Sequence, residues 1–99
     1  MIQAQIFVDK DDLMGTEPIY QFIVRFLLQH HIMGATAFQG KIGYGDSQHV
    51  NRPGELFSFD ETPIIVTCID EDAKVIAAIK ELRQVYKGGF IVTHPVDRW

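Results

Sequence analysis

A chain of 99 residues has room for a single hydrophobic core, and its 46% apolar and 22% charged residues match ordinary globular proteins, which excludes a disordered or fibrous class. The net charge of −4, with acidic and basic residues interspersed, offers no basic face for nucleic acid. No apolar run approaches the roughly 20 residues of a membrane-spanning helix, and the first residues lack a signal-peptide pattern. We therefore expect one cytoplasmic domain over residues 1–99, without membrane insertion.

The first half of the chain predicts a strand, a helix and a second strand. Strongly apolar residues occupy every second position over residues 2–8, which is the period of a strand. Apolar residues at i, i+3, i+4, i+7 and i+8 then predict a helix over 19–33, with Thr16 as its N-cap and Gly34 as its stop. A second strand is expected from residue 35 to about residue 42.

The second half repeats this order after a long connection. The segment 43–62 exceeds the loop lengths usual in compact domains, and such segments commonly carry function. The run 63–69 predicts a third strand, Asp70 is expected to cap a helix that reaches Tyr86, and residues 90–94 predict the last strand. The order β-α-β-β-α-β is typical of a ferredoxin-like α+β fold, a four-stranded antiparallel sheet with two helices on one face.

The third predicted strand is apolar on both of its faces. Ile64, Val66 and Cys68 point to one side, and Ile65 and Ile69 point to the other. Because two helices cover only one face of a sheet, we expect copies of the chain to associate through their open faces as a homo-oligomer. Cys68 is the only cysteine and is expected to be a buried small hydrophobe rather than a reactive thiol.

Three glycines within six residues mark the junction of the second strand and the long connection, in the sequence Gly40-Lys41-Ile42-Gly43-Tyr44-Gly45. Two interpretations are open. The segment is either a loop base whose amides and Lys41 meet an anionic ligand, helped by Lys87-Gly88-Gly89, or a twisted hairpin with a bulge. Spacing alone favours the hairpin, because short glycine clusters are weak motifs and this one is neither a Walker loop nor a dinucleotide fingerprint.

Apolar side chains gather late in the long connection, at Leu56, Phe57 and Phe59. These side chains either dock onto a protein partner or pack beside the sheet, and the sequence leaves both interpretations open.

Metal binding and catalysis find little support in the spacing of reactive residues. His30 and His31 are adjacent on a predicted helix and point about 100° apart, unlike an i, i+4 pair that shares one ion, so we expect no metal site. Ser47, Ser58 and Cys68 have no base at a diagnostic spacing. We therefore expect no catalytic residues and no enzymatic activity.

Several of these segments together resemble a known family. They are Gly15-Thr16-Glu17-Pro18-Ile19-Tyr20, Gly34-Ala35-Thr36-Ala37 and Gly40-Lys41-Ile42-Gly43-Tyr44-Gly45, with His49 following. They are similar to segments of a group of uncharacterised bacterial and archaeal proteins related to the PII signal-transduction proteins, and the likeness covers nearly the whole chain. The resemblance implies a ferredoxin-like subunit that forms a homotrimer around its open sheet faces.

The resemblance also implies a function and a set of site residues. In PII proteins the long loop contacts a metabolic enzyme or a membrane transporter, and ligands such as adenine nucleotides bind between subunits at the base of that loop. It thus implies a signalling protein that binds a small anionic effector, such as an adenine nucleotide, and that has no fixed cofactor. The implied ligand-binding residues are Gly40, Lys41, Gly43, Tyr44, Gly45, His49, Arg52, Lys87, Gly88, Gly89 and Arg98, and the implied partner-binding residues are Leu56, Phe57 and Phe59.

A second function is compatible with the same fold. The divalent-ion tolerance proteins are related trimers, and a resemblance to them would imply a metal-ion-binding trimer instead of a nucleotide-binding regulator.

Overall fold

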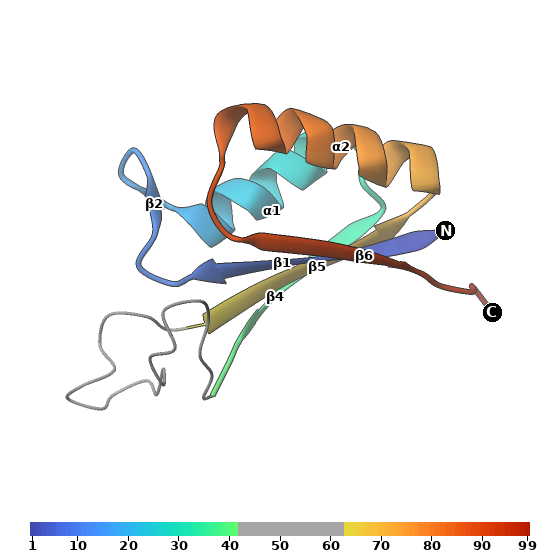
Figure 1. Ribbon diagram of the computed structural model, residues 1–99, viewed down its shortest axis with the longest axis horizontal. Coiled ribbons are helices and arrows are strands. Elements are labelled where there is room, and N and C mark those ends of the chain that lie inside the picture. The colour runs from blue at the N-terminus through green and yellow to red at the C-terminus, as the bar shows by residue number, and fades with distance from the viewer. Residues whose placement is uncertain (42–62) are drawn as a thin grey trace.

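The computed structural model describes residues 1–41 and 63–99, and its main elements follow the predicted order, with two short strands added before the first helix (Figure 1). One sheet contains β1 (Ile2–Asp9), β4 (Gly34–Gln39), β5 (Pro63–Asp70) and β6 (Phe90–Pro95). The helices are α1 (Ile19–Gln29) and α2 (Asp72–Val85), and two short strands, β2 (Leu13–Met14) and β3 (Glu17–Pro18), form a separate hairpin before α1. Neither helix of this described part is long and apolar enough to cross a membrane.

The sheet has the strand order β4-β5-β1-β6, and each neighbouring pair is antiparallel. Strand β1 lies inside the sheet and pairs with β5 over its whole length, from Ile2 opposite Asp70 to Asp9 opposite Pro63. Both helices lie on the same side of the sheet (Figure 1). This arrangement confirms the predicted ferredoxin-like α+β fold.

The hydrophobic core lies between the helices and the sheet. Strands β1 and β5 and both helices contribute its main buried side chains: Ile2, Ala4, Ile6, Val8, Ile19, Ile23, Leu27, Ile64, Val66, Cys68, Val75, Ala78 and Leu82. Cys68 is 2% exposed, so the prediction of a buried cysteine is confirmed, and burial raises the pKa of its thiol.

The start of α1 differs from the prediction. Thr16 is not the N-cap, because Glu17 and Pro18 pair with β2 as a strand and the helix begins directly after Pro18. No side chain of residues 1–41 and 63–99 caps the helix; instead the N–H of Ile19 donates to the carbonyl oxygen of Asp12 at 2.8 Å. The small hairpin therefore supplies the acceptor that a capping side chain would have supplied.

Three further element boundaries also differ from the prediction. Helix α1 ends at Gln29 rather than at residue 33, since His31 adopts the left-handed conformation with φ 58 before Gly34 is reached. Strand β4 ends at Gln39. Asp70 is the last residue of β5, and the N-cap of α2 is Glu71.

Candidate functional site

Two of the segments predicted to bind a ligand lie at the same end of the sheet. At the end of β4, the N–H of Gly40 donates to the carbonyl oxygen of Pro63 at 2.7 Å, which joins β4 to the start of β5. At the start of β6, a Cβ on Gly89 would lie 2.8 Å from the carbonyl oxygen of Phe7 near the end of β1. The residues Lys87–Gly89, named the glycine turn below, therefore occupy the same end of the sheet as Gly40 and Lys41.

These two segments lie at opposite edges of the sheet, however. Strands β5 and β1 separate β4 from β6, so three strand spacings of about 4.8 Å place the two edges about 14 Å apart. One chain thus presents Gly40 and Lys41 at one edge and the glycine turn at the other. The structure does not bring the two predicted halves of the site together within a single chain.

Arg98 lies at the other end of the sheet. It follows β6, and its guanidinium lies 3.9 Å from the sulfur of Met33, the residue before β4. The 6 residues of β6, about 20 Å of extended chain, separate Arg98 from the glycine turn. A small ligand at the glycine turn of one chain therefore does not reach Arg98 of the same chain.

The glycine turn is held by side chains that the sequence analysis did not assign to the site. One guanidinium nitrogen of Arg83 donates to the carbonyl oxygens of Tyr86, at 3.3 Å, and of Gly88. Tyr86 is 9% exposed, and its hydroxyl donates to Oδ2 of Asp12 at 3.2 Å. Burial, followed by the neighbouring Asp12 carboxylate, raises the pKa of Tyr86 to about 12, so this hydroxyl remains a donor at neutral pH.

A sequence signal for Arg83 does exist. An arginine in the last turn of a helix often donates to the final carbonyl groups, and Arg83 stands one turn before the glycines. The partner Asp12 has no such local signal, because it lies 74 residues before Tyr86 in the chain.

Both glycines of the turn are closely approached by their surroundings. A Cβ on Gly88 would lie 2.8 to 2.9 Å from three atoms of the Tyr86 side chain. Gly89 has φ +68, and its Cβ would meet the backbone of Phe7. The turn is therefore packed directly against an aromatic ring and against strand β1.

The open face of the sheet carries a row of large apolar side chains. Phe38, Ile65, Phe7 and Phe90 are register partners across all four strands, and we call them the phenylalanine row. They alternate with the residues buried under the helices, so they face the other way. Phe38 is 55% exposed and Phe90 is 64% exposed. The two-sided apolar character predicted for the third strand is thus confirmed, and the phenylalanine row continues it across all four strands at one end of the sheet.

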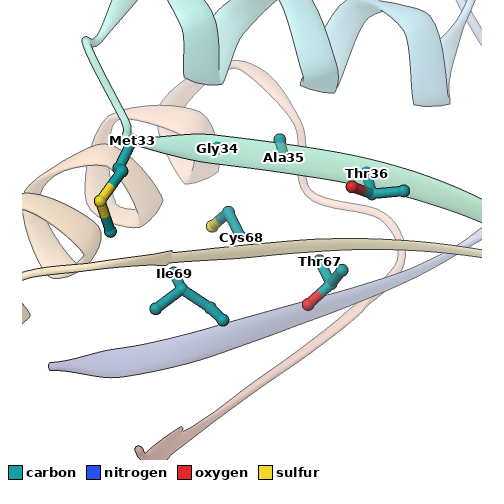
Figure 2. Close-up of a pocket in the computed structure, with 7 residues that line it drawn as sticks. All are labelled: Met33, Gly34, Ala35, Thr36, Thr67, Cys68 and Ile69. Carbon is teal, nitrogen blue, oxygen red and sulfur yellow. The ribbon is translucent and has the colours of Figure 1, made fainter. Parts of the chain in front are cut away.

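Two open pockets lie at the end of the sheet opposite the glycine turn, and both are lined by Met33 and Ile69. One has a volume of about 310 Å³ and lies along β4 and β5, where Cys68 points to the side opposite Thr67 and Ile69 (Figure 2). It is lined by Met33, Gly34, Ala35, Thr36, Thr67, Cys68 and Ile69. The other, about 290 Å³, is lined by Met1, Met33, Ile69, Val96, Asp97 and Arg98. Of the predicted ligand-binding residues that the structure describes, only Arg98 lines either of these two pockets.

The remaining predicted residues lie outside the part of the chain that the structure describes. They are Gly43, Tyr44, Gly45, His49, Arg52, Leu56, Phe57 and Phe59, and their roles stay predictions. Within residues 1–41 and 63–99, no three His, Cys, Asp or Glu side chains are grouped as a metal-binding site requires.

The sequence matches a known family over nearly its full length. The profile of DUF190, a family described as Uncharacterized ACR, matches residues 1–98. This chain belongs to the DUF190 family. A UPF0166 protein of Aquifex aeolicus is 27% identical over 85 residues, covering 85% of this chain and 80% of the relative. A UPF0166 protein of Methanocaldococcus jannaschii is 28% identical over 98 residues, covering 93% and 87%.

The fold of this DUF190 protein is similar to that of CPII, a nitrogen regulatory PII-like protein from Thiomonas intermedia K12. The structure of CPII bound to ADP, AMP and bicarbonate gives a TM-score of 0.67 at 14% identity and covers 94% of this chain and 82% of CPII. The structure of CPII bound to ADP and bicarbonate gives 0.65 at 15% identity with the same coverage. The predicted resemblance to an uncharacterised PII-like family is confirmed.

Proposed function

We propose that this DUF190 protein is a non-catalytic regulatory protein of the cytoplasm that forms a homotrimer and binds a small anionic effector between its subunits. The observation that carries the proposal is the placement of the two glycine segments. Gly40 and Lys41 share one end of the sheet with the glycine turn but stand at the opposite edge. Each edge presents half of a site, and a closed ring of copies brings unlike edges next to one another.

The open sheet face supplies the contact between copies. Both helices lie on one side of the sheet and leave its other face uncovered by either helix (Figure 1). On that open face the phenylalanine row leaves Phe38 and Phe90 exposed. Contiguous exposed apolar surface of this kind marks an interaction site in a soluble protein. Association through this face buries the row close to the end of the sheet that carries Gly40 and the glycine turn.

The effector in this proposal is an adenine nucleotide, alone or with bicarbonate. CPII, which has the same fold, is bound to ADP, AMP and bicarbonate in its structures. Lys41 and Lys87 supply positive charge on the two edges, and glycine backbone permits close approach of an anion. Arg98 contributes only as a residue of a neighbouring copy.

The effector regulates a partner protein, a metabolic enzyme or a membrane transporter, through the segment 43–62. The support for this step is the sequence, which gathers Leu56, Phe57 and Phe59 in one long connection, together with the likeness to PII proteins. Regulation requires the effector to bind two states of the protein with different affinity.

Thermal unfolding with ATP, ADP, AMP, bicarbonate and phosphate tests the proposal. A ligand at 100 times its Kd stabilises the folded state by about 2.7 kcal/mol, which raises Tm by several degrees. We expect this rise with an adenine nucleotide, its loss in Lys87→Ala and its retention in Lys80→Ala, which removes an exposed charge from α2. No rise with any of these compounds contradicts the effector, and equal losses in both variants indicate an unspecific charge effect.

A further inference from the structure

The peptide groups of the glycine turn have a defined direction. Arg83 donates to the carbonyl oxygens of Tyr86 and Gly88, so both carbonyl groups point toward its guanidinium. The peptide bonds that follow are trans, and in a trans peptide the next N–H points the opposite way. The N–H groups of Lys87 and Gly89 therefore both point away from Arg83.

These two amides are available to a ligand. Neither the N–H of Lys87 nor that of Gly89 donates to any residue of the described chain. They are two positions apart, and both point away from Arg83, to the same side of the turn. Successive backbone N–H groups of a turn that face one side form a concavity that binds anions. The Lys87 side chain adds a positive charge beside them.

Tyr86 fixes the turn from another direction. Its ring lies where a side chain on Gly88 would stand, and its hydroxyl donates to Asp12. The backbone of Asp12 is itself held at both of its polar groups: its carbonyl oxygen accepts from Ile19 at 2.8 Å, and its N–H donates to Asp9 at 3.1 Å. The hydrogen bond of Tyr86 thus connects the turn to the start of α1.

We propose that Arg83 and Tyr86 are positioning residues that hold the glycine turn so that the amides of Lys87 and Gly89 face an anionic oxygen of the ligand. This inference rests on the proposed function, and it assigns Arg83 to the turn rather than to the ligand. A turn that is ordered before binding raises affinity, because the apparent Kd equals the intrinsic Kd divided by the fraction of molecules in the competent conformation.

The first experiment needs no ligand. Backbone ¹⁵N order parameters of the glycine turn are measured in the wild-type protein and in three variants, Arg83→Ala, Tyr86→Phe and Lys80→Ala. We expect order parameters of about 0.85 in the wild-type protein and in Lys80→Ala. In Arg83→Ala we expect them to fall below about 0.6, with a smaller fall in Tyr86→Phe. Unchanged order parameters in Arg83→Ala overturn the inference. The Tyr86→Phe variant is a second, independent test, because its ring still fills the core and only the hydroxyl is lost.

The second experiment measures the affinity for ADP and for inorganic pyrophosphate at two salt concentrations. We expect Arg83→Ala to weaken binding about tenfold with the salt dependence of Kd unchanged, since Arg83 acts through the turn and not through its charge. A weaker salt dependence in Arg83→Ala means direct contact with the ligand and overturns the positioning role. If the wild-type protein binds neither compound, the proposed function fails together with the anion-binding role of the two amides, and the order parameters alone decide whether Arg83 holds the turn.

Discussion

Asp70 accepts a hydrogen bond from the backbone N–H of Met33 at 2.8 Å and so joins the end of β5 to the residue before β4. The same carboxylate accepts the N–H of Glu71 at 2.7 Å and pairs with the ammonium group of Lys74 at 3.0 Å. Only 8% of the Asp70 side chain is exposed. One buried carboxylate therefore fixes the relative positions of β4, β5 and α2.

Replacement of Asp70 by alanine should be strongly destabilising. Asp70→Ala leaves the two backbone N–H groups of Met33 and Glu71 without acceptors, and we expect a loss of about 3 kcal/mol in the free energy of unfolding, measured with urea. Lys74→Ala removes a half-exposed partner and should cost at most about 1 kcal/mol. Equal losses in the two variants would show that the ion pair, and not the backbone hydrogen bonds, carries the effect.

The Asp70 contribution also depends on pH. The N–H of Glu71, followed by Lys74, lowers the pKa of Asp70 below its usual value of 3.8. A group with a lowered folded-state pKa stabilises the protein above its unfolded pKa and ceases to do so as the pH falls through the folded value. The free-energy difference between wild type and Asp70→Ala should thus be constant above about pH 5 and shrink below about pH 4.

His30 connects the end of α1 to α2. Its Nδ1 lies 2.8 Å from the carbonyl oxygen of Phe26, and its Nε2 contacts the carboxylate of Glu81. Because both partners are acceptors, both contacts are hydrogen bonds only when the ring is protonated. The Phe26 carbonyl, followed by the Glu81 carboxylate, accordingly raises the pKa of His30 above 6.5.

This contact should stabilise the fold only at lower pH. With the folded-state pKa raised, the stabilisation is complete below about 6.5 and is lost as the pH rises through the folded value. We expect wild type to exceed Glu81→Gln in thermal stability at about pH 5.5 and the difference to vanish by about pH 8.5. A difference in Tm that is constant over this range would mean that the imidazolium does not form.

Gly40 should tolerate no side chain at the base of the 42–62 segment. A Cβ at this position would lie 2.6 Å from Cγ of Pro63, whose ring cannot rotate away, and the N–H of Gly40 is bound to the same residue. We expect Gly40→Ala to reduce the free energy of unfolding by about 1–3 kcal/mol. The matched control is Gly34→Ala, where nothing lies within 4 Å of the added carbon and the change should stay within about 0.5 kcal/mol.

Periodicity was sufficient to predict the elements but not their ends. The alternation over β1 and the apolar stripe of α1 are imposed by burial against one core, so they are visible in the sequence. The start of α1 was missed because strands of two residues, such as Glu17–Pro18, are too short to show a period. Asp70 was misplaced because a carboxylate can accept hydrogen bonds from a helix while its own residue still belongs to the strand.

The candidate site was predictable only where its signal is local. Glycine composition was enough to single out Lys87–Gly89 and Gly40 as candidates, because glycine tolerates conformations that other residues avoid, and their ligand-binding role stays a prediction. The contact of Asp12 with Tyr86 depends on a chain separation of 74 residues, which no local pattern records. Arg98 and the glycine turn lie at opposite ends of the sheet because β6 runs between them. This direction becomes clear only once the register of β6 with β1 is known.

The phenylalanine row offers the sharpest test of the proposed trimer. Phe90 is 64% exposed in the single chain, so a charge there costs the subunit little, whereas the same charge buried between open faces opposes association. We expect the wild-type protein to sediment at about 34 kDa, three chains of 11.3 kDa, and Phe90→Lys to shift toward the mass of one chain. The measurement is sedimentation equilibrium over a range of protein concentrations.

The control for this experiment is Leu28→Lys. Leu28 is 71% exposed at the end of α1, on the helical side of the molecule, where a positive charge near the helix C-terminus is favourable. The Leu28→Lys variant should have the same mass in sedimentation equilibrium as the wild-type protein. A wild-type mass of one chain at every concentration would contradict the trimer. If the Phe90→Lys variant remains at about 34 kDa, the copies do not contact one another through the phenylalanine row. The argument that unlike sheet edges meet beside that row then fails as well.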